Sequence, residues 1–246
     1  MDDNFKWCEY EWLTHERWGH IHPGKTECWY DPGAVSIDDH EYLHLKTRKN
    51  PNIFTLSKSD PNGYTEVESP VGIGLVSCTE KFGYGLFKIE AKLPDGPYMW
   101  PAFWLWSFSS WPPEIDVFEG YSGKRGSYFN WNMDLLIGNL WKTPSNIHLG
   151  KEPDNYSIGA KRHKGLGLTS PSKKFNKYTL LWKEDNISIF FNGILVRFID
   201  DKHIMEQFKG HKMNVVINNG IQKDHIKTEM NETDMIVKYF EYIPMY

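Results

Sequence analysis

Residues 114–119 read Glu-Ile-Asp-Val-Phe-Glu, three acidic residues interleaved with apolar residues that favour β-strands. Acidic side chains are rare in strands and costly to bury, so three of them in one strand indicate a catalytic role. Because the side chains of a strand alternate between its two faces, Glu114 and Asp116 share one face. Glu119, five positions after Glu114, falls on the other face of a regular strand.

A β-bulge, which adds one residue to a strand, would correct this mismatch. A bulge at Val117 or Phe118 returns Glu119 to the face of the other acids, and bulges are common beside active sites. The Cα atoms of Glu114 and Glu119 would then lie roughly 13 Å apart, and side chains that each reach about 4 Å leave about 5 Å between the carboxyl groups. Retaining glycosidases use this gap. The alternative, exposed charges on an edge strand, would explain one or two acids but not their position after the apolar stretch Trp100–Trp104.

Several segments around the acids resemble a known family. In chain order they are Tyr84–Pro94, Trp100–Trp106, Trp111–Pro113 and, at lower similarity, Asn146–Gly150 and Phe175–Phe198. With the acidic hexapeptide they resemble glycoside hydrolase family 16, which includes laminarinases, lichenases, agarases and carrageenases. The acidic motif is similar to the bulged form of the family motif, and the resemblance covers about residues 29–243.

The chain is expected to be all-β. Many short alternating segments separated by turn signals predict a sandwich or barrel, and Asn192-Gly193 is a strong hairpin signal. The resemblance narrows this to a β-jelly-roll sandwich of two curved antiparallel sheets with a concave substrate cleft. We expect one catalytic domain over residues 1–246, with residues 1–28 as an N-terminal extension packed on it. A short helical turn is expected at 204–209 and a long loop at 151–177.

The resemblance also assigns roles to the acids. It implies that Glu114 is the nucleophile that attacks the anomeric carbon, and that Glu119 protonates the leaving oxygen and then activates water. Asp116 lies between them, where its negative charge would raise the proton affinity of Glu119. Glu114 would need hydrogen-bond donors to stay ionised.

Substrate contacts are expected from the strand that precedes the acids. Trp100, Trp104 and Trp106 share one face, which lies either in the core or in the cleft. The motif resemblance favours the cleft, with Trp100 and Trp104 as stacking platforms and Trp106 near the strand end. His148 is carried over from the family as a sugar contact, the alternative being a satisfied loop histidine.

The sequence therefore predicts a retaining endo-β-glycanase that cuts β-1,3 or mixed β-1,3/1,4 glucan by double displacement. One alternative is a hydrolase of red-algal galactans such as agar, porphyran or carrageenan. Another, of a different class, is a glycan-binding module without catalysis. Transglycosylation, in which a sugar acceptor captures the intermediate in place of water, is a further alternative to hydrolysis. Sulfate binding would need cations in the cleft, and the candidates are Arg125, Lys142, Lys161 and Arg162.

Composition limits the other partners. The formal charge is −4, and we find no long run of Lys or Arg, so a nucleic-acid partner is not expected. No apolar run is long enough to cross a bilayer, so no membrane partner is expected. The expected partner is a polysaccharide substrate, and the protein is expected to be a monomer. Met1–Lys6 does not read as a signal peptide, so the extracellular location that we expect requires a leader already removed or another export route.

No cofactor is expected. Many family members bind a structural calcium through an aspartate in the last strand, but Lys238 stands there, so this site is doubtful. The cluster His15, His20 and His22 fits no metal-binding spacing and is interpreted as loop histidines. Three cysteines cannot all pair, although Cys8 and Cys28 could form a disulfide.

Overall fold

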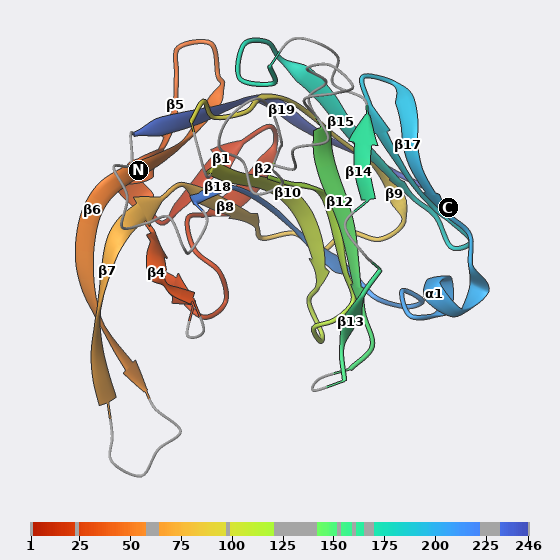
Figure 1. The fold of residues 1–246 in the computed structure, drawn as a ribbon, viewed down its shortest axis with the longest axis horizontal. Coiled ribbons are helices and arrows are strands. Elements are labelled where there is room, and N and C mark those ends of the chain that lie inside the picture. The colour runs from red at the N-terminus through yellow and green to blue at the C-terminus, as the bar shows by residue number, and fades with distance from the viewer. Residues whose placement is uncertain are drawn as a thin grey trace, which may run out of the picture.

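The computed structural model describes residues 2–22, 25–57, 64–96, 99–120, 142–151, 154–158, 161–164, 170–221 and 232–245. Its strands form two sheets, one of nine strands and one of ten. In Figure 1 the ten-stranded sheet arches over the nine-stranded sheet, from β6 and β7 on one side to β15 and β17 on the other. The predicted all-β sandwich is confirmed. No helix in the described part of the chain has the length and apolar character needed to cross a membrane.

The nine-stranded sheet carries the acidic hexapeptide on β11, between β10 and β12. All of its pairings are antiparallel. In spatial order its strands are β1 (Asn4–Trp7), β2 (Tyr10–Leu13), β8 (Leu75–Cys78), β18 (Met213–Ile221), β10 (Met99–Ser107), β11 (Glu114–Glu119), β12 (Lys142–Leu149) and β13 (Tyr156–Ser157), with β14 (Lys161–Lys164) paired to β12.

The ten-stranded sheet forms the outer layer and is antiparallel except where β4 runs parallel to β7. In spatial order its strands are β17 (Ile194–Ile199), β16 (Ile187–Phe191), β15 (Asn176–Trp182), β9 (Gly85–Lys92), β19 (Thr233–Pro244), β6 (Leu43–Ser57), β7 (Tyr64–Ile73), β4 (Lys25–Tyr30) and β3 (Ile21–His22), with β5 (Val35–Ile37) paired to β6. A short 3₁₀ turn, η1 (Pro32–Ala34), precedes β5 and is capped by Asp31, which accepts a hydrogen bond from the backbone N–H of Gly33.

The hydrophobic core lies between the sheets. Along β9 every second residue is buried, as period-two alternation predicts for a strand with one face in the core. The opposing layer includes Phe103, Leu105 and Phe118 from β10 and β11. The ring centroids of Phe118 and of Tyr178 on β15 are 4.4 Å apart. Burial of each such side chain contributes about 1.5–3 kcal/mol. With these residues directed inward, the opposite face of β10 and β11 is free to carry the tryptophans and acids.

Two local predictions are confirmed. Asn192 and Gly193 connect β16 to β17, and their φ angles of 51° and 81° match the left-handed conformation that a two-residue hairpin turn of type I′ requires. The expected helical turn is present as α1 (Lys202–Glu206), slightly earlier than predicted. Its start is set by Asp201, whose carboxylate accepts hydrogen bonds from the backbone N–H groups of His203 and Ile204.

One other expectation is wrong, and one open possibility is not realised. Residues 151–177 are not a single loop, because β13 and β14 both pair with β12, and polar residues on such short edge strands carry little period-two signal. The disulfide between Cys8 and Cys28 is not formed, and all three cysteines are free. The sulfur of Cys8 accepts a hydrogen bond from the backbone N–H of Phe240, whereas Cys28 packs on Val71 and Ile73, so each thiol is held by separate packing.

Candidate active site

The strand β11 contains the predicted bulge. Trp104 of β10 is opposite Asp116, and Phe103, the preceding residue, is opposite Phe118, so Val117 has no partner in the register. The extra residue reverses the alternation after Asp116, as bulges do. Both Val117 and Phe118 are buried in the core. Glu119 is thereby returned to the face of the nine-stranded sheet that is turned away from the core, here called the outer face, which also carries Glu114 and Asp116.

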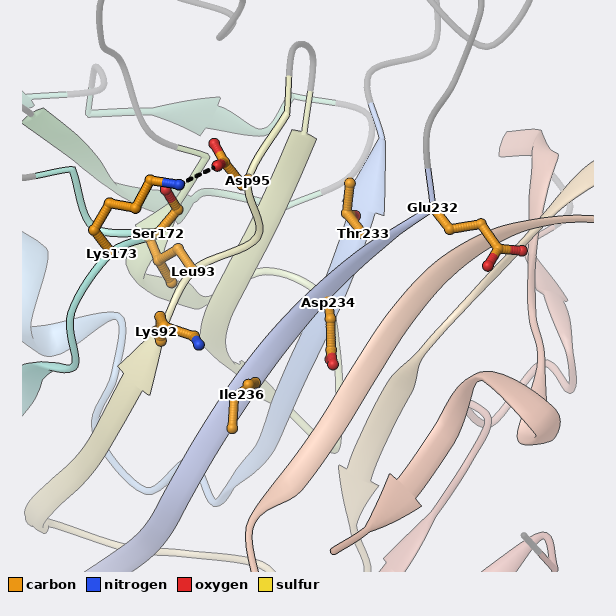
Figure 2. Close-up of a pocket in the computed structure, with 9 residues that line it drawn as sticks. All are labelled: Lys92, Leu93, Asp95, Ser172, Lys173, Glu232, Thr233, Asp234 and Ile236. Atoms are coloured by element: carbon orange, nitrogen blue, oxygen red, sulfur yellow. Dashed lines mark hydrogen bonds and ion pairs between the residues drawn. The ribbon is translucent and has the colours of Figure 1, made fainter.

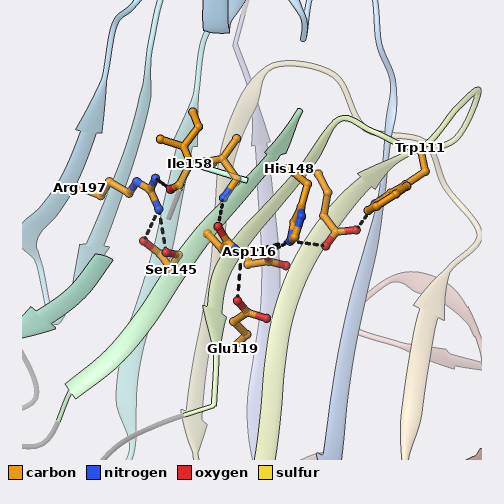
Figure 3. A network of polar contacts seen from close by, with 10 residues as sticks. Trp111, Asp116, Glu119, Ser145, His148, Ile158 and Arg197 are labelled. Carbon is orange, nitrogen blue, oxygen red and sulfur yellow. Dashed lines mark hydrogen bonds and ion pairs between the residues drawn. The ribbon is translucent and has the colours of Figure 1, made fainter. Parts of the chain in front are cut away.

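The three acids are joined by one polar network (Figure 3). The indole N–H of Trp111 donates to Oε2 of Glu114 at 2.7 Å. The Nε2 atom of His148 lies 3.6 Å from Oε1 of Glu114 and 3.4 Å from Oδ2 of Asp116. The network therefore links the first two acids through one imidazole.

Asn146 completes the network on the side of the third acid. Its Nδ2 atom donates to Oε1 of Glu119 at 3.3 Å and lies 3.2 Å from Nε2 of His148. Asn146 and His148 are two residues apart on β12, opposite Asp116 and Glu114 respectively, and so project from the same face. This continuous set of contacts places all three acids on one side of the sheet.

Burial controls the acidity of these groups. It raises the pKa of Glu114 to about 8, and the charge of Asp116 adds to this effect, whereas His148 and Trp111 oppose it. Asp116 is only 3% exposed, and its burial, together with the charge of Glu119, raises its pKa well above the usual range. Burial also raises the pKa of Glu119, against the opposing effects of His148, Asn146 and Lys25. The site therefore retains protons at neutral pH.

The tryptophans of β10 lie on the same outer face as the acids but differ in exposure. Trp100 and Trp104 are half-buried, and the indole N–H of Trp104 donates to Oδ1 of Asn218 at 2.9 Å. Trp106 is only 1% exposed, because Trp18 lies on it at 5.8 Å between ring centroids and the Arg17 guanidinium is 4.6 Å from its centroid. The expectation that Trp106 is available for stacking on a sugar therefore needs correction, whereas Trp100 and Trp104 stay candidates.

Sequence reasoning did not single out Asn146, Trp111 or Lys25. Asn146 could have been found from its i, i+2 spacing to His148 on one strand. Trp111 stands in one of the segments that resemble the family, and only the path of the chain before β11 reveals that its indole reaches Glu114. Lys25 is far from the acids in sequence, and no local pattern connects it to them.

Side chains that could bind a metal occur in the acid network and in the N-terminal segment. Ligand atoms of Glu114, Asp116 and His148 lie within 4.8 Å of one another, the geometry of a potential metal site, but they are already engaged in the acid network. In the N-terminal segment, Nδ1 of His20 is 2.8 Å from the backbone oxygen of Tyr30, a contact that occupies one ring nitrogen. Lys238 occupies a bulge of β19, and its ammonium donates to Oε1 of Glu90 at 2.7 Å.

A hollow of about 330 Å³, separate from the acid network, lies beside β9 and β19 (Figure 2). Lys173 and Asp95 at its edge form an ion pair at 2.8 Å, and Asp234 pairs with His44 at 2.7 Å. Three of the charged residues at this hollow are therefore already paired within the protein. Among the sulfate-binding candidates, Arg125 lies outside the described residues, and so do the side chains of Lys142, Lys161 and Arg162.

Known proteins are similar to this chain over most of its length. The family model for glycosyl hydrolases family 16 matches residues 24–237. The glucan endo-1,3-beta-glucosidase A1 of Niallia circulans is 30% identical over 160 residues, which cover 61% of this chain and 20% of that protein. The beta-1,3-glucan-binding protein of Penaeus monodon is 28% identical over 137 residues, which cover 52% of this chain and 35% of that protein. The chain thus spans well under half the length of these relatives.

A solved structure extends the likeness in fold over the whole sandwich. The catalytic domain of an endo-1,3-beta-glucanase (laminarinase) from Thermotoga petrophila RKU-1 superposes with a TM-score of 0.67 at 18% identity, covering 98% of this chain and 93% of that chain. The two sheets of the present chain therefore form the β-jelly roll that was predicted.

Proposed function

The chain belongs to glycosyl hydrolases family 16, and from this premise we propose that it is a retaining endo-β-glycanase acting on β-1,3 or mixed β-1,3/1,4 glucan. The observation that carries the proposal is the bulge at Val117, which brings Glu114, Asp116 and Glu119 to one face beside Trp100 and Trp104. Two carboxyl groups on one face are what double displacement at an anomeric carbon requires.

In this mechanism Glu114 attacks the anomeric carbon while Glu119 protonates the departing glycosidic oxygen. The carbon–oxygen bond to the leaving sugar breaks, and an ester bond forms between the sugar and Glu114. Glu119, now ionised, removes a proton from water, which attacks the same carbon and releases Glu114. Trp111 and His148 orient Glu114, and Asn146 orients Glu119, so both groups are held before substrate arrives.

Asp116 is suited to hold a proton between the two glutamates. It is the most buried of the three acids, and a charge there is opposed by burial and by Glu119. Its carboxyl group interacts with that of Glu114, and a hydrogen bond from protonated Glu114 lowers the pKa of Asp116. When the shared proton lies on Asp116 instead, the same contact favours the ionised form of Glu114, as a nucleophile requires.

The proposal is tested by incubating the protein with laminarin, lichenan, agarose, porphyran and carrageenans and measuring the reducing ends released. Release from laminarin or lichenan is expected, in steps that generate oligosaccharides of intermediate length. Release only from a galactan would replace the glucan assignment, and release of single sugars from the chain end would replace the endo assignment.

A second candidate is glycan binding without cleavage, favoured by the similarity to a relative whose name describes a glucan-binding protein. The retained Glu114 and Glu119 argue against it, since a binding module needs neither a nucleophile nor an acid. Binding of laminarin without release of reducing ends would support this candidate. In either case the polymeric ligand implies a protein that works outside the cell, which the location of the native protein would test.

A further inference from the structure

The segment that connects β2 to β3 places Trp18 on the face of the nine-stranded sheet that is turned away from the core. Trp18 packs with Trp106 of β10, and both belong to a cluster with Leu75 of β8 and Val216 of β18. This face is the one that carries the acids. Residues 14–22 precede residue 24, where the match to the family model begins, so this covering is supplied from outside the matched region.

The cluster beneath this segment adjoins the acid network. Trp106 is opposite Glu114 in the pairing of β10 with β11. Trp111, which donates its indole N–H to Glu114, packs against the same cluster as Trp18. Trp18 of the N-terminal segment and Trp111, the hydrogen-bond donor to Glu114, therefore pack on one cluster.

Two cations extend from this region. The Arg17 guanidinium is 4.6 Å from the centroid of the Trp106 ring, and the Arg17 side chain is exposed. Lys25 is exposed at the start of β4 and pairs across the β3–β4 turn with His22, whose ring lies 4.9 Å from that of Trp18. Arg17 and Lys25 therefore both border the surface formed by Trp18 and Trp106.

Neither cation has a carboxylate partner among the described residues, since the ion pairs there are formed by other side chains. The Lys25 ammonium is nevertheless near enough to Asp116 and Glu119 to favour their ionised forms, although burial has the larger effect.

We propose that residues Thr14–His22 together with Lys25 form one wall of the substrate-binding surface, where Arg17 and Lys25 donate hydrogen bonds to hydroxyl groups of the sugar bound beside Trp104 and Glu114. This inference rests on the proposed glycanase function and adds specificity-determining residues to it. Hydroxyl oxygens accept hydrogen bonds from guanidinium and ammonium groups, and charged donors form the stronger bonds. The wall would fix which sugar of the polymer lies over the acids.

The test uses the full chain and the variants Arg17→Met and Lys25→Met, which keep the length of the side chain and remove its donors. Each is expected to raise KM for laminarihexaose about tenfold, the loss expected for one hydrogen bond from a charged donor, with a smaller effect on kcat. Both should also shift the position at which end-labelled laminarihexaose is cleaved. Lys25→Arg, which keeps a charged donor, should restore most of the affinity.

Lys183→Met is the matched control, because Lys183 is exposed in the turn between β15 and β16 of the other sheet. Its KM and cleavage pattern should equal those of the wild type. Thermal unfolding of every variant shows whether the fold is retained. A folded Arg17→Met, Lys25→Met double variant with wild-type KM and cleavage pattern would overturn the proposal.

A failure of the glycanase function can be told apart from a failure of the wall. If the wild type releases no reducing ends from any glycan, the proposed function fails. The wall is then decided by binding of laminarihexaose, measured by tryptophan fluorescence. Weaker binding by Lys25→Met supports it, whereas equal binding, or none by the wild type, rejects it.

Discussion

Trp111 donates its indole N–H to Oε2 of Glu114 at 2.7 Å, a direct hydrogen bond to the proposed nucleophile. A donor of this kind favours the ionised carboxylate, against the burial that raises the pKa of Glu114 to about 8. We predict that Trp111→Phe raises this pKa further, because burial then acts without the opposing donor. The acid limb of kcat/KM against pH should therefore move to higher pH.

Trp29→Phe is the control for this experiment, because the indole N–H of Trp29 donates to the backbone oxygen of Asn50, away from the acids. Its profile should match the wild type. An acid limb that stays in place in Trp111→Phe, or that moves to lower pH, would show that this hydrogen bond does not hold Glu114 in its ionised form.

The acids themselves are predicted to dominate turnover. Glu114→Gln and Glu119→Gln preserve side-chain shape but remove the nucleophile or the proton donor, so kcat should fall by roughly three orders of magnitude or more. Reducing-end assays on laminarin measure the loss, with Glu241→Gln, an exposed residue on β19, as the control. Near-normal turnover in either active-site variant would refute the assignment of these roles.

Stability should depend on pH through the buried acids. Burial raises the pKa of Glu114 and of Glu16, which is 1% exposed, to about 8. The folded state then binds more protons than the unfolded state between about pH 4.5 and 8, so the free energy of unfolding falls as pH rises through this window. These two carboxyl groups therefore destabilise the fold most at the upper end of the window.

Glu16→Gln and Glu114→Gln remove this penalty. Each is expected to raise Tm by roughly 5 °C at pH 8 and by much less at pH 4.5, because the gain is on the order of a few kcal/mol in the basic range. Thermal unfolding at the two pH values measures the difference. A Tm gain that is equal at both values would indicate that titration of these groups is not its source.

Chelation should leave stability unchanged. Lys238 places its ammonium 2.7 Å from Oε1 of Glu90 and 4.2 Å from the centroid of the Phe175 ring, which puts a fixed positive charge where the family resemblance predicts a calcium ligand. We predict that EDTA and added calcium shift Tm by less than about 1 °C, a margin small against the stabilisation that a bound ion provides. A clear rise with calcium would reveal a binding site.

The sequence was sufficient to predict the site where the signal was local. The alternation of Glu114 and Asp116, broken before Glu119, required a bulge at one of two positions, and the structure has it at Val117. The face shared by Trp100 and Trp104 followed from the same period-two rule. Local signals of this kind need only the strand itself.

Contacts between distant segments could not be predicted in this way. Trp106 is buried because Trp18 and Arg17 lie on it, and Trp18 is 88 positions before Trp106 in the sequence. Similarly, β14 exists because it pairs with β12, although its own sequence is polar. Periodicity reports which face of a strand is apolar but not which segment covers it.

The stereochemistry of the first product tests the central claim most directly. If Glu114 and Glu119 act across one bound sugar by double displacement, proton NMR of laminarin or lichenan during the first minutes of cleavage will show the new reducing end in the β configuration. Mutarotation then produces the α anomer later. An α anomer as the first product would contradict the account, because it requires direct attack by water and no bond between Glu114 and the sugar.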